Sequence, residues 1–137
     1  MKTLSEVPAS LRAWFVSHFF VDMVVAVPLF IFPVQVLQRF GWMDVDVLAI
    51  RLVAAALFAV GGTSFLARDA TADVYRHMLD LKIIWSLAAM VGILISSWRE
   101  GVSRHGPSAA HAAIFALFLL FFIVWFYYRL RLRRVPG

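Results

Sequence analysis

One apolar run near the N-terminus limits what this chain can fold into. Residues 13–37 (AWFVSHFFVDMVVAVPLFIFPVQVL) lie between Arg12 and Arg39, and Asp22 is the only acidic or basic residue in the run apart from His18. A helix needs about 20 predominantly apolar residues to cross the hydrocarbon core of a bilayer. The run is also much longer than the ~7–15-residue apolar region of a cleaved signal peptide. We therefore expect a retained membrane-spanning helix here.

The rest of the chain has the same character. Hydrophobic residues make up 63% of the 137, charged residues 15%, and the mean hydropathy is +0.85, whereas soluble domains are about 45–50% apolar. Four apolar segments predict helices over approximately residues 11–37, 47–67, 72–98 and 108–128. We therefore predict an all-α polytopic membrane protein, a single membrane domain of residues 1–137 that forms a four-transmembrane-helix bundle. No internal sequence repeat is evident, and the absence of cysteine excludes disulfides and thiolate metal sites.

Prolines and small residues suggest how these helices bend and pack. Pro28 lies deep inside the first segment, where it should kink the helix and supply irregular backbone near Asp22. Pro33 lies near the far end and should end the helix. Small residues recur every fourth position in the second and third segments, a spacing that lets helix backbones approach closely. These residues are Ala55, Ala59 and Thr63, and then Ala88, Gly92 and Ser96.

The distribution of basic residues predicts the orientation. One side of the membrane would hold Lys2, Arg12, Arg68, Arg76, Lys82 and the four arginines near the C-terminus, and the other side Arg39, Arg51, Arg99 and Arg104. By the positive-inside rule both termini are then cytoplasmic, and we expect a multi-pass protein of the plasma membrane. The net charge of +5 does not indicate nucleic acid, because four arginines directly follow an apolar helix and suit anionic lipid headgroups. These four are Arg129, Arg131, Arg133 and Arg134.

The expected topology gathers the polar residues into one candidate site. His18 and Asp22 are four residues apart and share a helix face. An intramembrane carboxylate should face the protein interior, pair with a cation or be protonated. Arg68, Asp80 and Lys82 are expected at a similar depth, with Lys82 or Arg68 as the counter-cation. The five residues form either a ligand- or proton-binding cluster centred on Asp22 or a buried ion pair that fixes helix packing.

The sequence offers two possible cofactor sites, and we predict neither. Asp73, His77 and Asp80 share a helix face and resemble oxygen and nitrogen ligands of a metal. However, aspartates are also favoured in a first helical turn by the helix dipole, and no HExxH motif or histidine box is present. A haem held by His18 and His111 is disfavoured because the topology places these residues toward opposite membrane faces. We predict no metal and no cofactor.

Four short helices with a lone acidic residue in the first resemble the layout of the small multidrug transporters. That resemblance implies a transport function, with Asp22 in place of the glutamate of that family. It concerns layout alone, since nothing around Gly61, Trp85 or Gly92 matches a motif of the family, and no site residue is carried over from it.

Three functions are consistent with these features. The first is binding or transport of a small solute or proton through the cluster centred on Asp22, in a homo-oligomer or larger membrane complex because four short helices enclose little space. The second is a non-catalytic accessory or structural subunit of a membrane complex. The third is an enzyme acting on a lipid-soluble substrate, with the Asp-His face as acid and base. No nucleophile elbow, phosphate loop or metal motif is present, so we name no catalytic residue and do not expect an enzyme.

Overall fold

The computed structural model describes residues 7–101 and 109–133, and all regular structure in these ranges is helical. The elements are α1 (Ala9–Ile31), α2 (Pro33–Arg39), α3 (Val47–Leu66), the 3₁₀ helix η2 (Ala67–Asp69), α4 (Ala72–Gly101) and α5 (Ala109–Arg133). Four helical stretches are long and apolar enough to cross a membrane, namely α1, α3 with η2, α4 and α5. The prediction of an all-helical chain with four candidate spans is therefore confirmed for the described residues.

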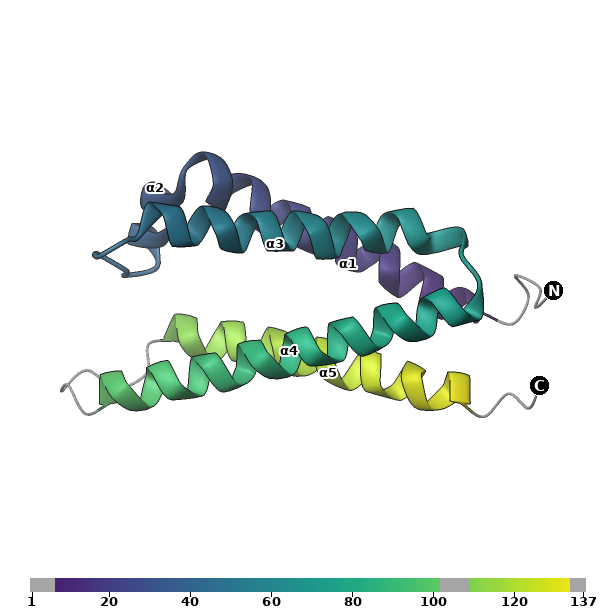
Figure 1. Cartoon of the computed structure of the whole chain (residues 1–137). Helices are drawn as coiled ribbons and strands as arrows, with labels where there is room; N and C mark the ends of the chain where they lie inside the picture. The colour runs from purple at the N-terminus through teal and green to yellow at the C-terminus, as the bar shows by residue number, and fades with distance from the viewer. Residues whose placement is uncertain (1–6, 102–108, 134–137) are drawn as a thin grey trace. The chain divides into compact units, whose positions relative to one another are not determined.

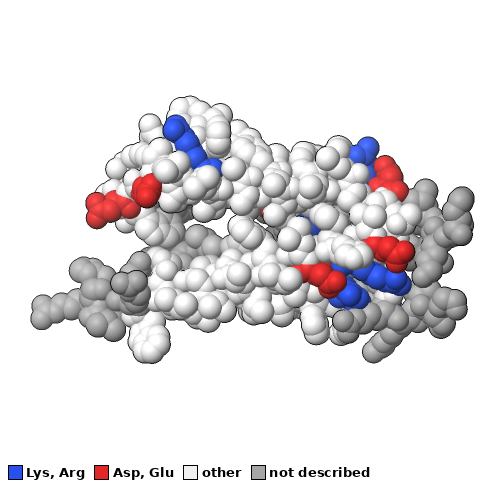
Figure 2. Space-filling model, viewed as in Figure 1, with Lys and Arg blue, Asp and Glu red and all other residues white. Residues whose placement is uncertain are grey.

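The chain divides into two compact units, each built on a helical hairpin. The first contains α1, α2, α3 and η2, and the second contains α4 and α5. Figure 1 shows α1 running alongside α3, and α4 running alongside α5. On the face shown in Figure 2, charged side chains gather near helix ends and the helix middles are largely uncharged. This pattern is what a bilayer requires, since charged groups are costly within its hydrocarbon core.

The first predicted helix is interrupted near its end. We expected one helix over residues 11–37, but α1 ends at Ile31 and α2 begins at Pro33. Phe32 lies between them with φ −125° and ψ 52°, because proline lacks an N–H and disfavours helical backbone in the residue before it. The helix continues through Pro28, which lies inside α1. Ending the helix near Pro33 was therefore predicted correctly, whereas continuing it to Leu37 was wrong.

Two polar side chains hydrogen-bond to backbone groups at the end of α1 and the start of α3. Arg51 of α3 donates from Nε to the carbonyl of Phe30 at 3.3 Å, where the end of α1 leaves carbonyls without an intrahelical partner and the helix dipole favours a cation. Asp46 caps α3, and its Oδ1 accepts from the amides of Leu48 and Ala49 at 3.0 Å each.

The face of α3 that packs on α1 is not the expected one. Ala55, Ala59 and Thr63 are exposed, and so are Ala88, Gly92 and Ser96 of α4. The buried residues of α3 are Ala54, Leu57, Val60, Gly61 and Ser64. The buried residues of α1 are Leu11, Phe15, His18, Asp22 and Ala26. The spacing of small residues identified the face with Ala55, Ala59 and Thr63. The close contact with α1 is instead made by the adjacent face of α3, which carries Gly61.

In the second hairpin, charged and aromatic side chains join the two helices. Arg129 of α5 binds Asp80 of α4 with both its Nε and an Nη, at 2.6 and 3.0 Å. The helices run further than expected, to Gly101 rather than residue 98 and to Arg133 rather than residue 128. Arginine favours the helical conformation, and the bidentate pair joins the polar end of α5 to α4.

Candidate functional site

The candidate site is built around two side chains of α1 that lie one helical turn apart. His18 and Asp22 occupy positions i and i+4, which brings them onto the face that α1 turns toward α3. His18 Nδ1 lies 2.9 Å from Asp22 Oδ2, and each side chain is only 7% exposed. The buried carboxyl and imidazole are therefore in direct contact.

A glycine of α3 forms the opposite wall. A Cβ atom placed on Gly61 would lie 2.7 Å from Asp22 Cβ and 2.9 Å from Asp22 Oδ2. Real contacts between carbon atoms are about 3.5–4.0 Å, so any other residue at position 61 would displace the carboxyl or push the helices apart. The α3 backbone therefore closes the site on this side, and Gly61 is a requirement of the site rather than a flexible link.

The adjoining turn of α3 adds a hydroxyl that is already engaged. Ser64 is fully buried, and its Oγ donates to the carbonyl of Val60 at 2.5 Å. This bond satisfies the hydroxyl within its own helix. The ionisable chemistry of the α1–α3 contact therefore belongs to His18 and Asp22.

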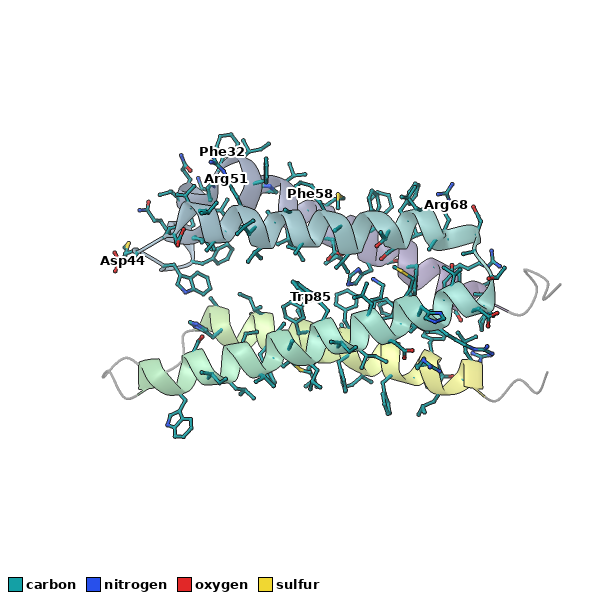
Figure 3. All side chains as sticks on the ribbon, viewed as in Figure 1. Phe32, Asp44, Arg51, Phe58, Arg68 and Trp85 are labelled. Atoms are coloured by element: carbon teal, nitrogen blue, oxygen red, sulfur yellow. The ribbon has the colours of Figure 1, made fainter. Side chains whose placement is uncertain are left out.

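Arg68 lies seven residues beyond Gly61, which is two helical turns or about 10 Å along the α3 axis. Its Nη1 donates to the Phe65 carbonyl at 3.0 Å, and its Nε lies 3.4 Å from Asp69. Arg12 reaches the same end of the hairpin and donates to the Arg68 carbonyl at 3.3 Å. Figure 3 shows Arg51 near the start of α3 and Arg68 just beyond its other end, in η2. The structure thus places Arg68 in a charged group at the end of the hairpin.

The remaining two predicted site residues belong to the second hairpin. Asp80 is bound by Arg129, as described above, and is 47% exposed. Lys82 is 1% exposed, and its Nζ lies 4.9 Å from the centre of the Trp125 ring. An ammonium over an indole face is stabilised by a cation–π interaction. Trp125 in turn stacks on Phe121, with ring centres 5.6 Å apart.

The arginines expected to bind lipid headgroups differ in their surroundings. Arg129 is occupied by Asp80, whereas Arg131 is exposed near the end of α5. The side chain of Arg133 and all of Arg134 lie outside the described residues. Headgroup binding by these residues stays a prediction, and Arg131 is the best placed of the two whose side chains are described.

The residues whose spacing resembles a metal site have other partners. Asp73 accepts from Arg76 at 2.8 Å, and His77 Nδ1 lies 2.8 Å from the Asp73 carbonyl. Within the described ranges, no three His, Asp or Glu side chains are grouped closely enough to hold a metal ion.

Reasoning from the sequence found His18 and Asp22 and noted the glycines of the second span, but it did not place Gly61 against Asp22. The available signal was the Gly61-Gly62 pair inside a predicted span, because glycine in a helix interior is disfavoured unless packing requires it.

Comparisons with family models, curated proteins and solved structures give no match for this chain.

Proposed function

We propose that this chain is a multi-pass protein of the plasma membrane, with both termini in the cytoplasm, that binds and transports a proton or a small solute through the His18–Asp22 pair. The observation that carries the proposal is the buried contact of 2.9 Å between a carboxyl and an imidazole on one candidate membrane span. Ionisable groups at such a place are costly, and they mark ion or proton pathways in membrane proteins.

The geometry of the pair suits a proton. His18 Nδ1 lies 2.9 Å from Asp22 Oδ2, so a positive charge on the imidazole would be balanced by the adjacent carboxylate. On the α3 side the Gly61 backbone excludes any ligand from the carboxyl. The pair is therefore shielded on the α3 side. A proton or solute would reach it from the other sides of α1.

A counter-cation completes the proposed site. The sequence offers Lys82 and Arg68 as candidates, and both stay part of the proposal. Asp80 is neutralised by Arg129 and takes a supporting role at most. The functional form is proposed to be a homo-oligomer, since one hairpin pair of this length encloses little space for a solute.

Infrared spectroscopy of the protein in lipid tests the proposal. As the pH is lowered, the Asp22 carboxyl should take up a proton reversibly and give a C=O stretching band that Asp22→Asn removes. Asp44→Asn is the matched control, because Asp44 is an exposed carboxylate in the connection between α2 and α3 (Figure 3). If no band depends on Asp22 over the pH range in which the protein is folded, and Asp22→Asn unfolds the chain, the pair is a permanent structural contact and the proposal is wrong.

A role as accessory or structural subunit is the second candidate. It is favoured by the exposed faces of small residues on α3 and α4, since such faces allow close helix association in membranes. Ala59→Leu fills the α3 face without touching the Asp22 site. Loss of assembly in this variant, together with an Asp22 carboxyl that ignores pH, would favour the subunit over the transporter.

A further inference from the structure

The break after α1 leaves a short segment between the two long helices of the first hairpin. Residues 32–46 comprise Phe32, the seven-residue helix α2 and the connection to α3. A helix of seven residues is about 10 Å long, whereas the hydrocarbon core of a bilayer is about 30 Å thick. The segment therefore cannot cross a membrane and stays at the end of the hairpin where α1 ends and α3 begins. Figure 3 shows Phe32, Asp44 and Arg51 at that end.

Large apolar side chains project from this segment. Phe32 is 55% exposed, Phe40 62% and Met43 73%, and Trp42 is half-buried beside them. Segments that lie in the plane of a membrane surface carry Phe and Trp on the side that enters the lipid, and tryptophan is enriched where headgroups meet acyl chains. The exposed side chains are therefore of the kind that this boundary accepts.

The polar residues of α2 lie on one face of the helix. Gln35, Gln38 and Arg39 are exposed and occupy positions i, i+3 and i+4. The apolar residues between them are half-buried. Phe32 directly precedes the helix and Phe40 directly follows it. A polar face between two exposed rings suits a helix that lies along a membrane surface rather than across the membrane.

Backbone hydrogen bonds fix the shape of the segment. Gly41 has φ 92°, which residues with a side chain rarely adopt, and beyond it the amide of Trp42 donates to the Leu37 carbonyl at 3.1 Å. At the end of α1, Arg51 of α3 donates to the Phe30 carbonyl at 3.3 Å. The exposed apolar surface is thus part of the folded hairpin.

The charges of the segment do not select a headgroup. Residues 32–46 contain one basic residue, Arg39, and two acidic ones, Asp44 and Asp46, and all three are exposed. Clusters of lysine and arginine are what draw a protein surface to anionic lipids. This segment has no such cluster, so contact with lipid would be made through its apolar side chains.

From these features we infer that residues 32–43 bind the boundary between the headgroups and the acyl chains of a bilayer, whatever the charge of the headgroups. Lipid is favoured over a second protein because Val24, Val27 and Ile31 continue the exposed apolar surface from Phe32 along α1, which is a candidate membrane span. A surface continuous with a lipid-facing span is covered by the same lipid. The inference goes beyond the proposed function and does not require transport.

This contact sets the depth of the candidate site. Asp22 lies ten residues from Phe32 and ten from Arg12, or about 15 Å along the helix axis in each direction. With Phe32 at one edge of a hydrocarbon core about 30 Å thick, Asp22 lies near the midplane. Gly61 is ten residues from Arg51, so α3 gives the same depth. Solute sites of many transporters lie near the midplane as well.

Spin labels on single cysteines measure these depths in the full-length protein, because the chain has no cysteine of its own. Met43→Cys and Val24→Cys are matched positions, since each native side chain is 73% exposed. In phosphatidylcholine vesicles, the label at position 43 should be reached by oxygen more than by a water-soluble nickel chelate. The label at position 24, two residues from Asp22, should lie deeper by on the order of 10 Å. Adding phosphatidylglycerol should change neither depth.

Four results would overturn the inference. A label at position 43 that meets nickel as freely as a label in water is not in lipid. A label there that neither reagent reaches is covered by protein, and spin–spin broadening would identify a second copy as the cover. A depth that requires phosphatidylglycerol contradicts apolar binding, and a label at position 24 no deeper than the one at 43 contradicts the depth of Asp22. The infrared titration of Asp22 decides the proposed function separately in every case.

Discussion

Replacing Gly61 by alanine tests the geometry of the candidate site most directly. The added methyl group would lie 2.7 Å from Asp22 Cβ, 2.9 Å from its Oδ2 and 3.2 Å from its Cγ. A comfortable separation is about 3.5–4.0 Å, so α1 and α3 must separate by on the order of 1 Å or the Asp22 side chain must leave its position. Neither change is easy, because the added methyl group is attached directly to the α3 backbone and Asp22 Cβ directly to the α1 backbone.

The expected cost follows from comparison with the neighbouring glycine. Overpacking of this kind destabilises proteins by about 1–3 kcal/mol. At Gly62, an added methyl group meets nothing within 4 Å, and alanine is favoured over glycine in a helix interior by about 1 kcal/mol. Gly61→Ala should therefore lower the free energy of unfolding, and Gly62→Ala should leave it unchanged or raise it. Because the gain in helix propensity applies at both positions, the two variants should differ by the overpacking cost alone, about 1–3 kcal/mol.

Reversible unfolding in mixed detergent micelles, followed by circular dichroism, measures this difference. The cause is checked by moving Gly61→Ala into two backgrounds. Asp22→Ala removes the contacts of the added methyl with Oδ2 and Cγ but keeps the one with Cβ, whereas Asp22→Gly removes all three. The cost of Gly61→Ala should fall in the alanine background and nearly vanish in the glycine background. Equal effects of the Gly61 and Gly62 variants would refute the close approach of α3 to Asp22.

Three further predictions concern the scaffold. A double-mutant cycle on Asp80→Asn and Arg129→Met should give a coupling of about 0.5–1 kcal/mol, since the pair is bidentate but half-exposed; a coupling near zero would show that the pair does not hold α5 to α4. Asp46→Ala should cost about 1 kcal/mol through loss of the helix cap, and hydrogen exchange should rise at the start of α3 and nowhere else. Pro33→Ala restores an N–H and should join α1 to α2, seen as added helical signal and slower exchange at Phe32; unchanged spectra would mean that packing rather than proline breaks the helix.

The existence of the four long helices could be predicted because each follows from a long apolar run. Their ends could not, because ends depend on contacts between elements. The guanidinium of Arg129 finds Asp80, 49 residues away in sequence, and α5 stays helical past the apolar region where we had ended it. The cap at Asp46 is, by contrast, a local feature, because it acts through amides only two and three residues away.

The candidate site divides in the same way. The contact of His18 with Asp22 is local and follows from a spacing of four residues on one helix. The identity of the wall opposite depends on how α3 is rotated, and small residues on two neighbouring faces of that helix left the rotation open. Gly61 and Ala59 are equally good small residues by composition, and only the packed structure shows that position 61 meets Asp22.

The break between α1 and α2 bears on what the site binds. Phe32 lies ten residues beyond Asp22, or about 15 Å along the helix axis, so the irregular backbone does not line the site as we had expected for Pro28. The carbonyls of Phe30 and Phe32 are also used within the protein, by Arg51 and by the amide of Val36. Broken helices at transport sites offer backbone carbonyls to metal cations, and hard cations such as Ca²⁺ take about six to eight oxygen ligands. With the break this far away and with α3 closing one side, Asp22 offers two oxygens and a neighbouring imidazole. That set is poor for a metal cation and sufficient for a proton.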